Sequence, residues 1–154
     1  KSSSLIAKRL APVRLVLCAS PAYLEQYGSP RRPEDLREHK YLRYSYMNMD
    51  PGHSLQKWLQ DSSRENTRGM ISNNGDVLIE AAIAGTGIAL QPTFIAGAAV
   101  KEGKLKVILP EHEPEPMALY AVYAHRQLLA SKVRSFIDFI DGFFGEPPYW
   151  DRFE

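Results

Sequence analysis

The chain has a single cysteine, no long hydrophobic run and almost no net charge, and each scarcity excludes a class of protein. Cys18 is the only cysteine among 154 residues, so no disulfide can form within the chain. No apolar run approaches the ~20 residues that a membrane-spanning helix needs. Residues 1–6 lack the hydrophobic region of a secretory signal. We therefore expect no membrane association and a reducing, cytoplasmic location.

Charge of one sign is equally scarce. Nineteen Lys and Arg residues oppose eighteen Asp and Glu residues, which leaves a formal net charge of +1. No global field would hold a polyanion, so nucleic-acid binding by this segment is not expected. Four basic residues open the chain and three acidic residues cluster later, and we expect both groups to be solvated surface. They are Lys1, Lys8, Arg9 and Arg14, and Glu111, Glu113 and Glu115.

Catalytic and cofactor-binding patterns are also missing from the sequence. Gly85-Thr86-Gly87 lacks the third glycine of a dinucleotide fingerprint, and there is neither a phosphate-binding loop nor zinc-ligand spacing. Ser20, between Ala19 and Pro21, lacks the glycines of a nucleophile elbow. We predict no metal, no cofactor and no enzymatic activity, and we expect the histidines to make structural hydrogen bonds or to face water. They are His39, His53, His112 and His125.

The sequence does contain a regular alternation of short apolar runs and helix signals. Helix starts are marked at Ser20-Pro21, Asn73-Asn74-Gly75 and Thr93, and Gly28 and Gly85 mark helix ends. This alternation predicts an α/β fold with largely parallel sheets. The expected strands are 13–19, 41–46, 67–72, 88–90, 106–109 and 119–123. The expected helices are 21–27, a short one from 33, 76–84, one from 93 that ends before 103, and one from 131.

Two segments near the end of the chain have distinct patterns. Residues 111–116 alternate Glu and Pro, which predicts an extended, exposed linker. The helix from Ser131 has one apolar stripe at helical spacing, and we expect this stripe to pack on a sheet. Its residues are Val133, Phe136, Ile137, Ile140, Phe143 and Phe144.

Four blocks of sequence stand in order along nearly the whole chain. They are LVLCASPAYL at 15–24, followed by Gly28-Ser29-Pro30, Pro33-Glu34-Asp35-Leu36 and His39; AAIAGTGIALQP at 81–92; Gly103-Lys104-Leu105 with LYAVY at 119–123; and KVRSFIDF at 132–139. In order and spacing these blocks resemble the effector-binding domain of LysR-type transcriptional regulators.

This resemblance implies a two-lobe α/β fold like that of the type 2 periplasmic binding proteins, with lobe two complete and lobe one partial. In that fold two crossing strands join the lobes, and a ligand binds in the cleft between them. Residues 1–19 would contain a remnant of lobe one and the first crossing strand, at 13–19. Residues 20–117 would form lobe two. Residues 118–154 would contain the second crossing strand and the C-terminal part of lobe one.

The resemblance also implies a function. A small, anionic metabolite would bind between the lobes and control DNA binding or transcription activation by a full-length homo-oligomer, a dimer or a tetramer. DNA would be contacted only through a winged helix-turn-helix, which we expect before residue 1. The rival interpretation is a solute-binding protein or an enzyme on the same two-lobe fold, because a fold alone does not fix function.

Candidate effector-binding residues follow from the same resemblance. The strand and loop after His39 would face the effector: Arg43 would pair with a carboxylate, Tyr44 would stack, and Ser45 would donate a hydrogen bond. An ordinary half-exposed edge strand is the alternative for all three. Further candidates lie at helix starts, whose free N–H groups suit an anion, or on the second crossing strand, with helix capping or hinge packing as the alternative. They are Ser20, Asn73, Asn74, Thr93 and Tyr123.

Overall fold

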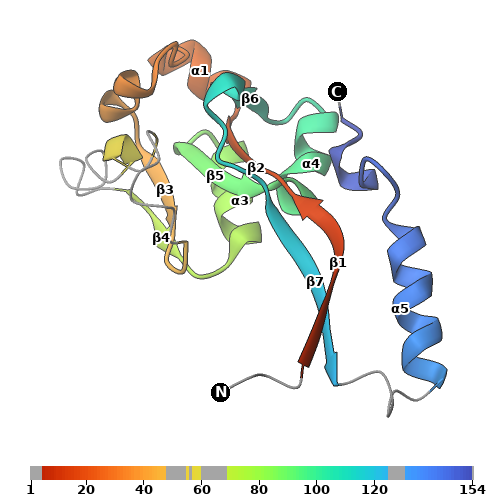
Figure 1. Ribbon diagram of the computed structural model, residues 1–154. Helices are drawn as coiled ribbons and strands as arrows, with labels where there is room; N and C mark the ends of the chain where they lie inside the picture. The colour runs from red at the N-terminus through yellow and green to blue at the C-terminus, as the bar shows by residue number, and fades with distance from the viewer. Residues whose placement is uncertain (1–4, 48–54, 56, 60–68, 125–130, 154) are drawn as a thin grey trace.

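The computed structural model of the chain describes residues 5–47, 55, 57–59, 69–124 and 131–153, and these form two separate sheets (Figure 1). A five-stranded sheet has the strand order β4-β3-β5-β2-β6, and a two-stranded sheet pairs β1 with β7. Sheets and helices together confirm the predicted α/β class. The strands of the larger sheet are β2 (Leu15–Ala19), β3 (Tyr41–Tyr44), β4 (Ile71–Ser72), β5 (Ile88–Pro92) and β6 (Lys106–Ile108).

The larger sheet is mixed and not largely parallel as expected. β3 pairs in parallel with β4 and β5, whereas β2 runs antiparallel to both β5 and β6. The prediction is right for β4 and β5, which α3 (Gly75–Ile83) joins, and for β5 and β6, which α4 (Thr93–Lys101) joins, because such crossover connections return the chain in the same direction. It is wrong for β2, which enters the sheet directly from the two-stranded sheet.

Helices cover both faces of the larger sheet. Residues of α1 (Pro21–Tyr27) and the 3-10 helix η1 (Pro33–Glu38) join one hydrophobic cluster, and residues of α3 (Gly75–Ile83) and α4 (Thr93–Lys101) join the other. Neighbouring residues of a strand point to opposite faces. Leu17 of β2 therefore belongs to the first cluster and Cys18 to the second, and β2 is buried on both sides.

Most local signals at helix ends are confirmed. The Ser20 hydroxyl accepts a hydrogen bond from the backbone N–H of Tyr23 (3.2 Å), and α1 spans the predicted residues. Asn74 caps α3, and Gly85 follows that helix with a φ of 78° that favours glycine. The prediction that Thr93 caps α4 is wrong, because Thr93 is the first helical residue and its hydroxyl bonds elsewhere.

Several predicted bounds change. β5 runs on to Pro92, beyond the predicted 88–90, and β6 ends at Ile108, one residue before its predicted end. The predicted strand 41–46 ends at Tyr44. The predicted strand 67–72 is confined to Ile71–Ser72, with residues 67 and 68 outside the described part of the chain. The predicted extended linker 111–116 instead begins within the 3-10 helix η2 (Pro110–His112).

β1 (Leu5–Val13) and β7 (Met117–Ala124) form a long antiparallel ribbon that leaves one edge of the larger sheet (Figure 1). The predicted strand 119–123 is confirmed within β7. The predicted single strand 13–19 is wrong, because the strand is interrupted at Arg14. The residues before Arg14 belong to the two-stranded sheet, and those after it belong to the five-stranded sheet.

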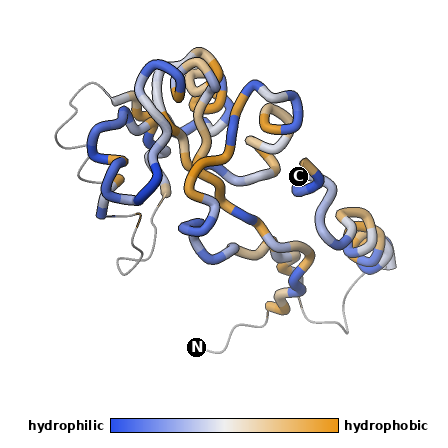
Figure 2. Tube along the Cα trace, turned by 90° about the horizontal axis from the view of Figure 1, so that it is seen from above, coloured by the Kyte–Doolittle hydropathy of each residue, from blue (hydrophilic) through white to orange (hydrophobic). Residues whose placement is uncertain are grey.

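α5 (Ser131–Phe143) lies beside the ribbon (Figures 1 and 2). Ile137 is its one buried residue. The Nζ of Lys8 on β1 lies 2.8 Å from an Asp141 carboxylate oxygen, which ties the helix to the ribbon. The apolar stripe thus packs on the two-stranded sheet only in part. Three phenylalanines of α5 stay exposed by more than half: Phe136 (62%) and Phe143 (57%) of the stripe, and Phe139 (64%) outside it.

We predict that the isolated chain self-associates through this aromatic face and the ribbon. In the described part of the chain β1 and β7 pair only with each other, so each presents a free strand edge next to exposed apolar side chains. Light scattering after gel filtration should give a mass above the 17.4 kDa of one chain. Replacing Phe136 and Phe139 with Ser should lower that mass, whereas Val77→Ser on α3 should not. A monomeric parent chain would contradict the prediction.

Candidate functional site

Several polar segments meet at the edge of the five-stranded sheet from which the ribbon leaves, here called the ribbon edge. β3, β4 and β5 are parallel, so their carboxyl ends, at Tyr44, Ser72 and Pro92, share this edge. Leu15 at the start of β2 pairs with Pro92, and β1 ends two residues earlier at Val13. The segments that follow these strands therefore lie beside the hinge between the ribbon and the larger sheet.

Asn73 and Asn74 form the start of α3 at the ribbon edge, and both are exposed. The side-chain oxygen of Asn74 accepts hydrogen bonds from the backbone N–H groups of Asp76 (2.9 Å) and Val77 (3.4 Å). The backbone N–H of Asn74 donates to the Ser72 hydroxyl (3.0 Å). Capping thus accounts for the side-chain oxygen of Asn74. The exposed Asn73 and the positive end of the helix dipole lie at the ribbon edge.

The three predicted residues of β3 and its following turn do not share one face. The backbone N–H of Ser45 donates to the Ser72 carbonyl (2.9 Å), which places Ser45 next to the start of α3. Tyr44 packs against the cluster beneath α3 and α4. Arg43 is exposed on the opposite face of the sheet, because adjacent strand residues alternate. Tyr44 and Ser45 therefore lie near Asn73, and Arg43 does not.

Gln91 is a polar residue of this region that the sequence reasoning missed. It is 1% exposed, and its Nε2 has no hydrogen-bond partner among the described residues. Its Oε1 lies 2.7 Å from where a Cβ atom would stand at Gly75, so this amide packs directly against the glycine at the start of α3. A glutamine in the otherwise apolar run of β5 was the available signal, because buried amides need partners.

Three further predicted residues stand apart from this group. Ser20 lies at the carboxyl end of β2, and because β2 is antiparallel that is the opposite edge of the sheet; it is 3% exposed and caps α1. Thr93 is fully buried at the ribbon edge. Tyr123 lies far out on the ribbon opposite Ile6, where it lines a cavity of about 450 Å³ between the ribbon and α5.

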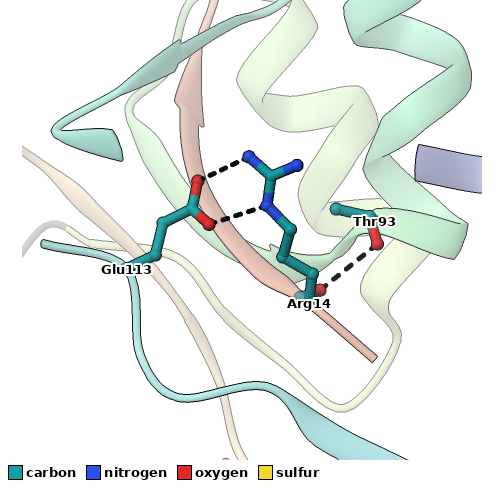
Figure 3. A network of polar contacts seen from close by, with 3 residues as sticks. All are labelled: Arg14, Thr93 and Glu113. Carbon is teal, nitrogen blue, oxygen red and sulfur yellow. Dashed lines mark hydrogen bonds and ion pairs between the residues drawn. The ribbon is translucent and has the colours of Figure 1, made fainter. Parts of the chain in front are cut away.

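Arg14 holds the hinge together (Figure 3). Its guanidinium forms a two-pronged ion pair with Glu113, with Nε–Oε2 at 2.7 Å and Nη2–Oε1 at 3.0 Å. Its carbonyl accepts hydrogen bonds from the backbone N–H (2.9 Å) and the hydroxyl (3.4 Å) of Thr93. The expectation that Arg14 and Glu113 are solvated surface is wrong, because the fold brings the two single-sign segments together. We call Arg14, Thr93 and Glu113 the hinge node.

Two buried titratable groups belong to the core and not to a reactive site. Burial raises the pKa of the Cys18 thiol to about 12, and this thiol donates to the Ala89 carbonyl at 3.6 Å. Burial also lowers the pKa of His39, whose Nδ1 lies 3.0 Å from the Tyr23 hydroxyl. Both groups are neutral at pH 7. The predicted structural hydrogen bond of His39 is confirmed.

Within the described ranges, no group of three or more His, Cys, Asp or Glu side chains is arranged to hold a metal ion. Across the same ranges, every helix is too short or too polar to cross a membrane. The predictions for His53 and His125 lie outside the described residues.

A mixed α/β unit joined by two crossing strands to a further helical segment is the architecture of two-lobe ligand-binding domains. This chain belongs to the family described as LysR substrate binding domain, whose model matches residues 1–144.

Named relatives agree with this assignment. The chain is 32% identical over 149 residues to the HTH-type transcriptional activator AaeR of Escherichia coli K12, covering 95% of this chain and 47% of AaeR. It is 34% identical over 134 residues to an uncharacterized HTH-type transcriptional regulator of Haemophilus influenzae, covering 86% of this chain and 46% of that protein. The chain therefore spans about half the length of these curated relatives.

Solved structures show the same fold. The regulatory domain of CrgA from Neisseria meningitidis, a LysR-type transcriptional regulator, matches with a TM-score of 0.71 at 25% identity, covering 92% of this chain and 69% of that one. Full-length AphB from Vibrio cholerae, a virulence activator, matches with a TM-score of 0.72 at 28% identity, covering 93% of this chain and 49% of AphB.

Glu113→Gln should lower the free energy of unfolding by about 1.5–3 kcal/mol, because it removes the negative charge that pairs with the half-buried Arg14 guanidinium. Denaturant unfolding followed by circular dichroism measures this change. Glu102→Gln is the matched control: Glu102 pairs with Lys104 at 2.6 Å on the exposed surface, where a pair adds little stability. Equal losses in the two variants would contradict the role assigned to the hinge node.

The Cys18 thiol of the folded protein should react with a chromogenic disulfide reagent at pH 8 only as fast as the protein unfolds, because the thiolate is the nucleophile and burial keeps it protonated. Since its pKa is raised from 9.0 to about 12, stability should fall as the pH rises above about 9, where the unfolded thiol ionises first. Reaction at the rate of a free thiol would refute this.

Proposed function

We propose that this chain is the ligand-sensing domain of a LysR-type transcriptional regulator and that it binds a small anionic metabolite at the ribbon edge. Family membership supports the assignment, as do the printed names of the relatives, which are transcriptional regulators. Ligand binding would change the angle between the five-stranded sheet and the ribbon, and that change would be passed to the rest of the regulator.

The observation that carries the proposed ligand site is the start of α3 beside the hinge. The positive end of the helix dipole and its first N–H groups favour an anion there. Asn73 and Ser45 add exposed donors, and the Gln91 amide lies behind Gly75. Asp76 places a carboxylate in the first turn of the helix. The ligand should therefore carry a hydroxyl or amino donor next to its anionic group.

The other candidate residues have a smaller role in the proposed ligand site, or none. Arg43 would pair only with a second anionic group that reaches around the edge of β3. Three candidates are not part of the proposed ligand site. Ser20 lies at the opposite edge of the sheet, Thr93 is completely buried, and Tyr123 lies far out on the ribbon. We place lobe two at about residues 15–116, since β2 belongs to its sheet, and assign the ribbon and α5 to the hinge and lobe one.

The full-length regulator would act as a homo-oligomer in the cytoplasm and would contact DNA through a winged helix-turn-helix outside these residues. AaeR and the Haemophilus influenzae regulator support the helix-turn-helix, because the chain covers only about half of each and both carry HTH-type names. The same names favour a regulator over a solute-binding protein or an enzyme on this fold, so we propose no second function.

Asn74→Asp should weaken binding of a small carboxylate at least ~10-fold, because it keeps the capping oxygen and adds a negative charge at the start of α3. A thermal-shift screen of hydroxy- and amino-carboxylates identifies a binder, and calorimetry measures its affinity for each variant. Gln26→Glu, an equally isosteric change on α1, is the control and should leave the affinity unchanged. Equal weakening by both variants, or none by Asn74→Asp, would refute the site.

A further inference from the structure

The residues that follow α5 return to the five-stranded part of the molecule. The chain turns at Gly145, whose φ is 77°, and the short helix η4 (Tyr149–Asp151) packs against α4 (Figure 1). The family match ends at residue 144, so most of this segment lies outside the matched region. We call residues 144–153 the strap.

Gly97 of α4 is the anchor of the strap. A Cβ atom at position 97 would stand 2.5 Å from the Trp150 carbonyl oxygen and 3.2 Å from the Phe153 ring. The first distance is shorter than any real contact, so the strap can lie this close to α4 only over a glycine. Glycine inside a helix weakens that helix relative to alanine. The close approach of the strap explains why a glycine stands at position 97 inside this helix.

Aromatic contacts extend the anchor in two directions. The Trp150 ring meets Phe94 of α4 edge-on, with ring centroids 6.2 Å apart, and the Tyr149 ring meets Phe143 at the end of α5 edge-on, at 6.1 Å. The Arg14 guanidinium lies 5.7 Å from the centroid of the Phe153 ring. The strap thus contacts α4, the end of α5 and the hinge node together.

The docked strap also has two unsatisfied polar atoms. The indole Nε1 of Trp150 and a carboxylate oxygen of Asp151 are buried without a hydrogen-bond partner in the described part of the chain. Water would satisfy both atoms if the strap came away. The aromatic contacts therefore favour the docked strap, whereas the lost hydrogen bonds of these two atoms disfavour it. This balance makes the attachment of the strap weaker than the packing in the core of the sheet.

We propose that the strap is a latch that sets the angle between the five-stranded sheet and the ribbon with α5. Two crossing strands that leave one sheet edge side by side form a hinge, and a hinge alone permits rotation. A third attachment, at Gly97 one helical turn along α4 from Thr93 of the hinge node, restrains that rotation. The latch depends on contacts within the chain and needs no ligand, so it can be tested independently of the proposed carboxylate site.

Gly97→Ala tests the latch, because the added methyl group collides with the strap while alanine favours the helix itself. Spin labels at Lys101→Cys on α4 and Lys132→Cys on α5 report the angle by double electron–electron resonance, in samples diluted with unlabelled protein. Cys18 is buried and stays unlabelled. We expect the distance distribution to widen roughly twofold in Gly97→Ala. Gly142→Ala in α5, where a Cβ atom meets open space, is the matched control and should not change it.

A chain that ends at Phe144 keeps α4 intact and removes the latch, so it should show the same widening even if Gly97→Ala folds poorly. In a Trp58→Phe background, Trp150 emission should also shift to longer wavelength in Gly97→Ala and not in Gly142→Ala. An unchanged distance distribution in either Gly97→Ala or the shortened chain would overturn the proposal.

Discussion

The ion pair between Arg14 and Glu113 is the interaction on which the arrangement of this molecule depends. Arg14 is the one residue between β1 and β2, and Glu113 lies on the segment that leads back into β7. Both crossings between the ribbon and the larger sheet are thereby fastened to each other. The Arg14 carbonyl also holds the first residue of α4, Thr93. The hinge node therefore lies where β2, α4 and the segment before β7 meet.

Contiguous contacts link the node to the other features. α4 starts at the Arg14 carbonyl and carries Gly97 beneath the strap. β5 ends at the same edge and places Gln91 under Gly75 at the start of α3. A ligand at the start of α3 would therefore lie one strand away from the hinge, and the strap lies on the next helix. Such contacts are suited to shift the balance between two angles of the hinge.

Sequence reasoning succeeded where the signal is local. Ser20-Pro21 and Asn74 predict helix starts because a side-chain oxygen satisfies N–H groups two or three residues away. It failed where the answer depends on pairing. Arg14 and Glu113 are 99 residues apart, so nothing local distinguishes them from solvated charges. Ser20 and Asn74 look alike as caps, and only the antiparallel entry of β2 puts them on opposite edges of the sheet. Gln91 points to the candidate site only once the structure shows that its amide packs against Gly75 at the start of α3.

We propose that the start of α3, beside the hinge, receives the ligand. Nitrogen-proton correlation spectra of the chain, recorded while a bound carboxylate is titrated, test this most directly. A ligand at this site should cause the largest shifts at the backbone N–H groups of Gly75 and Asp76, smaller ones at the hinge node, and none in α1. Shifts confined to α1 or to the far end of the ribbon, with Gly75 unmoved, would contradict it.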